Sequence, residues 1–96
     1  MEKIIKKFID YLLLEKNYSK HTVLAYQKDI ESFGLFINKE FETDNFLEVN
    51  YNLIRSWIVY LSDNGIENTS INRKISSLKS FYKFLLKTKQ IEQSPL

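Results

Sequence analysis

Apolar residues recur at steps of three and four positions in four stretches of the chain, which is the spacing of one face of an α-helix. The stretches predict helices over about residues 2–16, 19–38, 50–64 and 69–89, and therefore an all-α fold. The expected buried stripes are Ile5, Phe8, Ile9 and Leu12; Val23, Tyr26, Ile30, Phe33 and Ile37; Ile54, Trp57, Ile58 and Leu61; and Ile71, Ile75, Leu78, Tyr82 and Leu85.

The residues that flank these stripes are typical of helix ends. Ser19 and Asn50 each stand just before a stripe, where a side-chain oxygen can accept a free backbone N–H group of the first turn. Asn68 or Thr69 is expected to do the same for the last helix. Gly65 is expected to end the third helix in the left-handed conformation.

Residues 39–49 show no clear periodicity and are expected to form a loop with Phe41, Phe46 or Leu47 packed against the core. The chain holds only two glycines and one proline, which favours long helices over a fold of many strands. Its 96 residues, 44% of them hydrophobic, suit one compact domain with a modest core. We therefore expect a single four-helix domain over residues 1–96.

Several kinds of chemistry are excluded by composition. The absence of cysteine rules out disulfides, thiolate nucleophiles and thiolate zinc sites, and a single histidine rules out a multi-histidine metal site. The carboxylates show no pairing beyond that of an ordinary helix surface. We expect no catalysis, cofactor or metal from this chain. The apolar N-terminal stretch is interrupted by Asp10 and reads as a helix of the mature domain; with the lack of cysteine, this favours a cytoplasmic location.

The net charge of +2 conceals a strong segregation of charge along the chain. Residues 40–67 carry six acidic side chains and one basic one, whereas residues 69–90 carry six basic side chains and no acidic one. A local basic region of this kind is typical of a surface that meets an anionic partner such as nucleic acid. The alternative is a solvated lysine-rich face, in which basic residues favour the C-terminal end of a helix.

The candidate contact residues lie on the sides of the second and fourth helices that face away from the apolar stripes. In the fourth helix small hydroxyl groups alternate with cations, so donors to phosphate oxygens stand where a close approach is possible. His21 is the only histidine and is more typical of a surface hydrogen-bonding group than of a catalyst. The candidates are Lys20, His21, Thr22 and Lys28 in the second helix and Ser70, Asn72, Arg73, Ser76, Lys79 and Lys83 in the fourth.

Three side chains leave their role open at this point. Asp29 is interpreted as a member of a surface salt bridge. Phe81 and Phe84 widen the apolar face of the fourth helix, either as part of a broad buried face or as a contact for another domain or subunit. The second possibility gives an alternative function, in which the chain is a helical protein-interaction module that docks a partner through the Phe81 and Phe84 side.

The order of these motifs resembles the N-terminal core-binding domain of the tyrosine recombinases, the phage-integrase and Xer family. Its second helix tends to read Ser-x-x-Thr-x-x-x-Tyr-x-x-Asp, matched here by Ser19, Thr22, Tyr26 and Asp29. Ser94-Pro95 stands where the family commonly ends in Asn-Pro. The fourth-helix motif is matched by Ser70, Ile71, Arg73, Ile75, Ser76, Leu78, Lys79, Phe81 and Tyr82.

The resemblance implies a compact, SAM-like orthogonal bundle of four helices that covers one side of the DNA duplex, with the second and fourth helices toward the major groove. It also implies two partners besides double-stranded DNA: a separate C-terminal domain that holds the catalytic residues, and other recombinase protomers on the DNA. No tyrosine of this chain is then the nucleophile. Because the chain uses lysine where many relatives have arginine, we expect mainly backbone contacts, with Arg73 the residue best suited to read a base.

Overall fold

The computed structural model describes residues 2–96. They form four α-helices and one short 3-10 helix: α1 (Glu2–Leu14), α2 (Lys20–Phe41), η1 (Phe46–Glu48), α3 (Tyr51–Asp63) and α4 (Asn68–Lys87). No strand occurs among these residues, so the prediction of an all-α, four-helix fold is confirmed. Over the same span, no helix is both long enough and apolar enough to cross a bilayer.

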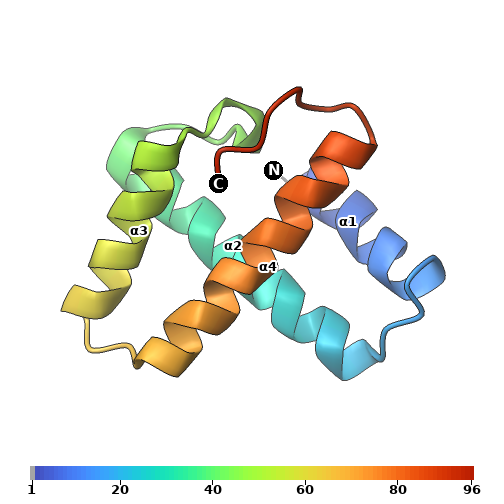
Figure 1. The fold of residues 1–96 in the computed structure, drawn as a ribbon, viewed down its shortest axis with the longest axis horizontal. Coiled ribbons are helices and arrows are strands. Elements are labelled where there is room, and N and C mark those ends of the chain that lie inside the picture. Colours follow the sequence, from blue (N-terminus) through green and yellow to red (C-terminus); the bar gives the residue numbers. More distant parts are fainter. Residues whose placement is uncertain (1) are drawn as a thin grey trace.

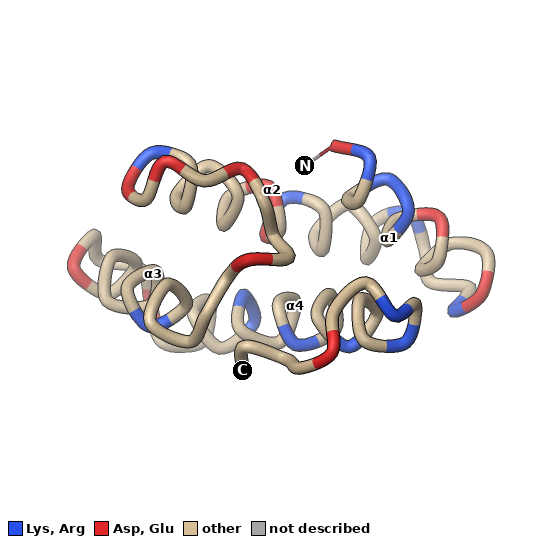
Figure 2. The backbone as a smooth tube through the Cα atoms, turned by 90° about the horizontal axis from the view of Figure 1, so that it is seen from above, with Lys and Arg blue, Asp and Glu red and all other residues tan. Residues whose placement is uncertain are grey.

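The two longest helices, α2 and α4, cross each other at the centre of the molecule (Figure 1). They form the most extensive helix pair, while α1 packs on α2, and α3 contacts both α2 and α4. Seen from above, α1 and α2 lie in one layer and α3 and α4 in the other (Figure 2). Every helix thus turns one face toward a shared interior, as the single stripe on each of them requires.

The interior is unusually rich in aromatic side chains, and they join the two layers. Phe81 of α4 meets Phe46 of η1 with ring centroids 5.0 Å apart and Phe8 of α1 at 5.2 Å. Phe33 of α2 packs edge-on against Trp57 of α3 at 5.1 Å. Edge-to-face pairs of this kind add to the stabilisation that burial itself provides.

The burial of Phe81 and Phe84 corrects the alternative function that the sequence left open. Phe81 is 0% exposed and Phe84 is 7% exposed, and both belong to the core. Their rings contact Phe8 of α1, at 5.2 and 5.5 Å between centroids. The two phenylalanines widen the buried face of α4 because α1 covers it. They are therefore not available to dock a partner.

Two of the predicted helix caps are confirmed. Ser19 Oγ accepts the backbone N–H of Thr22 at 3.2 Å, and Asn50 Oδ1 accepts that of Leu53 at 3.1 Å. Gly65 follows α3 with a φ of 79°, a conformation that only glycine adopts without strain.

The cap predicted for α4 is wrong. The helix begins at Asn68, so Glu67 takes the cap position and makes no side-chain cap hydrogen bond. Asn68 and Thr69 already lie inside the first turn. Their backbone is helical, and a residue caps through its side chain only when its own backbone is still extended.

The segment between α2 and α3 differs in extent from the prediction. α2 continues to Phe41, whose ring packs back on Phe36 at 6.0 Å between centroids. Of the three loop residues considered, Phe46 is the buried one, at 1% exposed. The Tyr82 hydroxyl donates to the Phe46 carbonyl oxygen at 2.9 Å, and burial raises the pKa of this tyrosine above its usual value.

Candidate nucleic-acid interface

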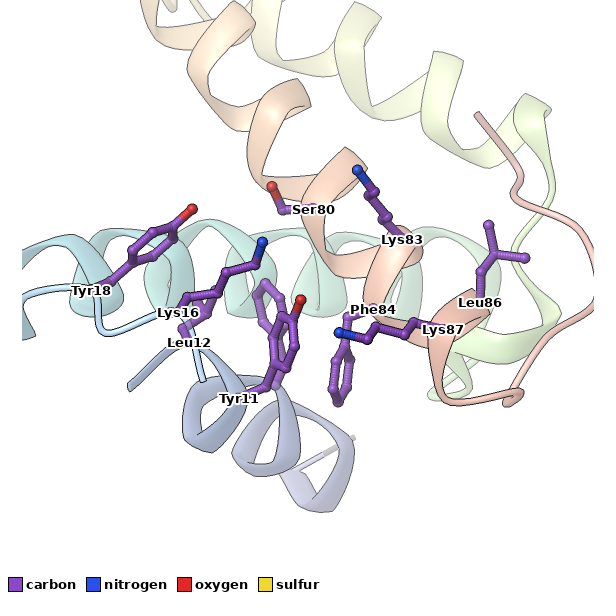
Figure 3. Close-up of a pocket in the computed structure, with 10 residues that line it drawn as sticks. Tyr11, Leu12, Lys16, Tyr18, Ser80, Lys83, Phe84, Leu86 and Lys87 are labelled. Carbon is purple, nitrogen blue, oxygen red and sulfur yellow. The ribbon is translucent and has the colours of Figure 1, made fainter. Parts of the chain in front are cut away.

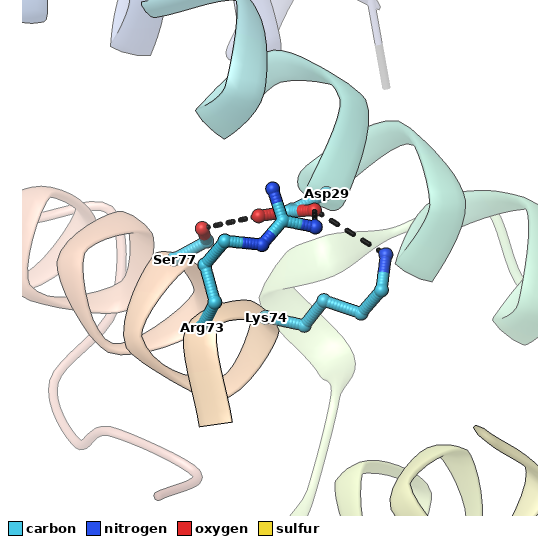
Figure 4. Close-up of polar contacts among 4 residues, drawn as sticks. All are labelled: Asp29, Arg73, Lys74 and Ser77. Atoms are coloured by element: carbon cyan, nitrogen blue, oxygen red, sulfur yellow. Dashed lines mark hydrogen bonds and ion pairs between the residues drawn. The ribbon is translucent and has the colours of Figure 1, made fainter. Parts of the chain in front are cut away.

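A buried carboxylate joins α2 to α4 where the two helices cross. Asp29 is 2% exposed. Its Oδ2 accepts a hydrogen bond from Ser77 Oγ at 2.7 Å, and its Oδ1 lies 3.1 Å from Arg73 Nη2 and 3.4 Å from Lys74 Nζ (Figure 4). The sequence interpretation of Asp29 as a surface salt-bridge residue was therefore wrong about its burial. A buried carboxylate is tolerated only when it is paired and hydrogen-bonded, and all three partner side chains come from α4.

Arg73 can contact a second group besides Asp29, because Asp29 lies against only one nitrogen of its guanidinium. Its side chain is 53% exposed, and Asp29 contacts it through Nη2. A guanidinium carries five N–H donors in a rigid plane. The ion pair with Asp29 fixes the orientation of that plane and leaves the remaining donors at the surface of α4.

A cleft of about 410 Å³ opens beside Asp29 and brings predicted residues of the two helices together. His21 and Thr22 line it from the first turn of α2, and Arg73 and Ser76 line it from the first half of α4. Thr22 Oγ1 lies 3.0 Å from Ser19 Oγ, so the hydrogen bonding at the start of α2 also orients this hydroxyl. The start of α2 and the polar flank of α4 thus lie side by side.

The remaining predicted residues surround this cleft at different distances. Asn72, Lys79 and Lys83 are exposed and share with Ser76 the outer arc of α4, by the helical repeat. Lys20 and Lys28 are exposed on α2, but neither lines the cleft.

Ser70 lies apart from the rest of the candidate set on α4. It is partly buried, and by the helical repeat it falls on the side of Ser77 and Phe81, toward the interior. The structure therefore gathers His21, Thr22, Arg73 and Ser76 most closely and leaves Ser70 on the inner side of the helix.

The charges near this surface are unbalanced. Among residues 2–96 the only ion pairs within 4.0 Å are those of Arg73 and Lys74 with Asp29. The exposed lysines of α4 therefore have no carboxylate partner. Lys and Arg follow α4, whereas Asp and Glu gather at the far end of α2 and in the segment after it, away from the helix start that carries His21 (Figures 1 and 2).

Sequence reasoning missed a second group of residues, which comes from the end of α1. Lys16 and Tyr18 line another cleft together with Ser80, Lys83 and Lys87 of α4. The only available signal was the position of Lys16 and Tyr18 next to the Ser19 cap. Periodicity cannot show that this helix end meets the second half of α4.

Comparison with known proteins gives a consistent assignment. The family model described as "Phage integrase, N-terminal SAM-like domain" matches residues 5–89. The tyrosine recombinase XerC of Bacillus subtilis (strain 168) is 37% identical over 95 residues, which cover 99% of this chain and 31% of the relative. No solved structure gives a significant match.

Two further relatives show the same partial coverage. The tyrosine recombinase XerC of Bacillus licheniformis is 40% identical over 88 residues, covering 92% of this chain and 29% of the relative. The tyrosine recombinase XerD of Rickettsia bellii is 36% identical over 92 residues, covering 96% of this chain and 30% of the relative. The chain thus spans about 30% of the length of these curated relatives.

Proposed function

Because the chain belongs to the family of phage-integrase and tyrosine-recombinase N-terminal SAM-like domains, we propose that it binds duplex DNA through the joined surfaces of α2 and α4. The membership confirms the resemblance that the helix motifs suggested. The surface consists of the cleft beside Asp29 and the exposed polar arc of α4, with Lys20 and Lys28 at its margin.

The observation that carries this proposal is the juxtaposition of unpaired cations and short hydroxyl groups from two crossing helices. Thr22 and Ser76 offer small donors to phosphate oxygens, and Lys79 and Lys83 lie on the same flank of α4 without carboxylate partners. Arg73, braced by Asp29, is the residue best suited to meet a base edge, because its free donors keep a fixed plane.

The same proposal covers what the rest of the parent protein does. The chain itself carries no catalytic group in this scheme. It grips one side of the duplex during recombination or integration, in the cytoplasm and on the nucleoid. A C-terminal domain of the same protein closes on the other side and breaks and rejoins the strands, and further protomers assemble on the DNA. Binding by this domain alone is expected to be weak, because half of the grip is missing.

Removing two exposed cations of α4 tests the proposed surface. Arg73→Ala combined with Lys79→Ala is expected to weaken binding to duplex DNA about tenfold or more at low salt, because the affinity depends on the number of phosphates that cationic side chains neutralise. Fluorescence anisotropy with a labelled duplex measures the change. Lys3→Ala combined with Lys6→Ala on α1 is the control, since it removes the same charge elsewhere.

Two results bear on the outcome of this test. Thermal unfolding followed by circular dichroism shows whether the Arg73/Lys79 variant is still folded. We expect it to be folded, because Asp29 keeps Lys74 and Ser77 as partners. If a folded Arg73/Lys79 variant binds the duplex as tightly as the unsubstituted chain does, the proposed surface is wrong.

A further inference from the structure

A second cleft, of about 640 Å³, lies between the end of α1 and the second half of α4 (Figure 3). Lys16 and Tyr18 come from the segment that links α1 to α2, and Ser80, Lys83 and Lys87 come from successive turns of α4. None of these residues lines the cleft beside Asp29. The three lysines of this cleft thus converge from two segments that are about 70 residues apart in the chain.

The floor of this cleft consists of aromatic rings that pack on one another. The ring of Tyr11 packs on Phe84 with centroids 4.9 Å apart, and Phe84 packs on Phe8 at 5.5 Å. Two ammonium groups approach the Tyr11 ring, Lys16 Nζ at 6.0 Å and Lys87 Nζ at 5.1 Å from its centroid (Figure 3). A ring in this position holds the ammonium groups in place without neutralising them.

The cleft therefore presents positive charge that no protein group balances. Within residues 2–96 the carboxylate of Asp29 makes the only ion pairs, and its partners are Arg73 and Lys74. Lys16, Lys83 and Lys87 have no carboxylate within 4.0 Å. Three ammonium groups around one hollow repel one another, and an anion bound among them would relieve that repulsion.

The donors around the hollow are suited to a phosphate group. An ammonium group has three N–H donors and no acceptor, and the hydroxyl groups of Ser80 and Tyr18 add donors at the rim. The Tyr11 ring is flanked by two lysines, and Tyr18 stacks on Tyr26 with centroids 5.9 Å apart. A backbone phosphate needs only the charged rim that these ammonium and hydroxyl groups form.

We propose that this cleft binds a phosphate of the duplex backbone, so that the DNA interface extends past α2 and α4 to the end of α1. The inference rests on the proposed function. Its support is continuity along one helix, because Ser80 and Lys83 stand one turn beyond Ser76 and Lys79 on the same flank of α4. The phosphate-binding residues are Lys16, Lys83 and Lys87. The ring of Tyr11 positions Lys16 and Lys87.

The salt dependence of duplex binding tests this site. Each neutralised phosphate contributes about 0.9 to the slope of log affinity against log salt concentration. Lys16→Gln combined with Lys87→Gln is expected to reduce the magnitude of the slope by about 0.9, the contribution of one phosphate. Affinity at about 0.1 M salt should fall roughly eightfold for each phosphate that the variant no longer neutralises. Fluorescence anisotropy of a labelled duplex, titrated at several salt concentrations, gives both quantities.

A matched variant separates a built site from a general decrease in positive charge. Lys3→Gln combined with Lys6→Gln removes two positive charges from α1, and Lys6 borders α2 at Gln27 and Glu31 rather than α4. This control is expected to leave the slope within about 0.3 of the unsubstituted value, because neither lysine binds a phosphate in the proposed interface.

The outcomes distinguish this inference from the function on which it rests. An unchanged slope and affinity in the Lys16/Lys87 variant, or equal decreases in both variants, would overturn the phosphate site while leaving duplex binding by α2 and α4 in place. Failure of the unsubstituted chain to bind any duplex at low salt would overturn both. If the cleft binds an acidic protein segment and not DNA, the Lys16/Lys87 variant will show an unchanged slope and affinity for the duplex, which overturns the phosphate site.

Discussion

At the scale of single residues, the carboxylate of Asp29 is held by three side chains of α4: Ser77 and Lys74 donate hydrogen bonds to it, and Arg73 forms an ion pair with it. These interactions fix how α4 lies on α2 and how the guanidinium of Arg73 is turned. The residue thus links the packing of the domain to the surface that we propose for DNA. Its effect on stability can be measured separately from DNA binding.

Asp29→Ala is expected to lower the free energy of unfolding by about 2–4 kcal/mol. The substitution leaves the buried Ser77 and the partly buried Lys74 without their acceptor, and the destabilisation is moderated because Arg73 can reach solvent. Urea unfolding followed by circular dichroism measures the change. Glu31→Ala, an exposed carboxylate on the same helix, should change stability by less than about 0.5 kcal/mol. Equal effects of the two substitutions would contradict the role assigned to Asp29.

At the scale of elements, the starts of the helices differ in how their free N–H groups are satisfied. α2 and α3 have side-chain caps at Ser19 and Asn50, whereas Glu67 before α4 makes no such bond. The helix that carries most of the proposed cationic surface thus begins without a side-chain cap. Its position depends on packing through Leu78, Phe81 and Leu85, each of which is fully buried.

Glu67→Asp is expected to stabilise the domain by about 0.5–1 kcal/mol, because the shorter carboxylate can accept a first-turn N–H group where glutamate does not. The charge is unchanged, so duplex binding should not be affected. Ser19→Ala is the opposing control and should cost about 1 kcal/mol. Thermal unfolding of both variants provides the measurement, and a lower melting temperature for Glu67→Asp would show that the backbone at this position cannot accommodate a cap.

At the scale of the whole molecule, the distribution of charge matters more than its total. The net charge is only +2, yet α4 carries Lys and Arg and no Asp or Glu, while Glu40, Glu42, Asp44 and Glu48 follow one another at the end of α2 and in the segment after it (Figure 2). In the proposed complex a duplex meets one side of the molecule, and the electrostatic field on that side sets the affinity. We therefore expect strong salt dependence from a protein that is nearly neutral overall.

Four to six phosphate contacts correspond to a log–log salt slope of about −4 to −5 for duplex DNA. Raising the salt from about 50 to 200 mM should then weaken binding by roughly 250-fold to 1000-fold. Isothermal titrations at four or more salt concentrations give the slope. A slope of smaller magnitude than about 2 would mean that the cationic flank of α4 does not face the DNA.

The sequence was sufficient where the determining physics is local. The stripe of α4 from Ile71 to Leu85 repeats within each turn, and such periodicity reports which face is buried without reference to any other element. The Ser19 and Asn50 caps were found for the same reason, since each cap acts on its own first turn. At Glu67 the local signal failed, because four polar residues in succession, from Glu67 to Ser70, could each begin the helix.

The sequence by itself determined that the chain forms four amphipathic helices, which family it belongs to, and that α4 has a cationic flank. Only the tertiary structure decided that Asp29 is buried under Arg73 and Ser77, that α1 covers Phe84, and that Lys16 meets Lys87. The physical reason is that these interactions join residues far apart in the chain, 48 positions in the case of Asp29 and Ser77. A hydrophobic stripe specifies which side of a helix is buried, but the partner on that side depends on how all four helices pack together.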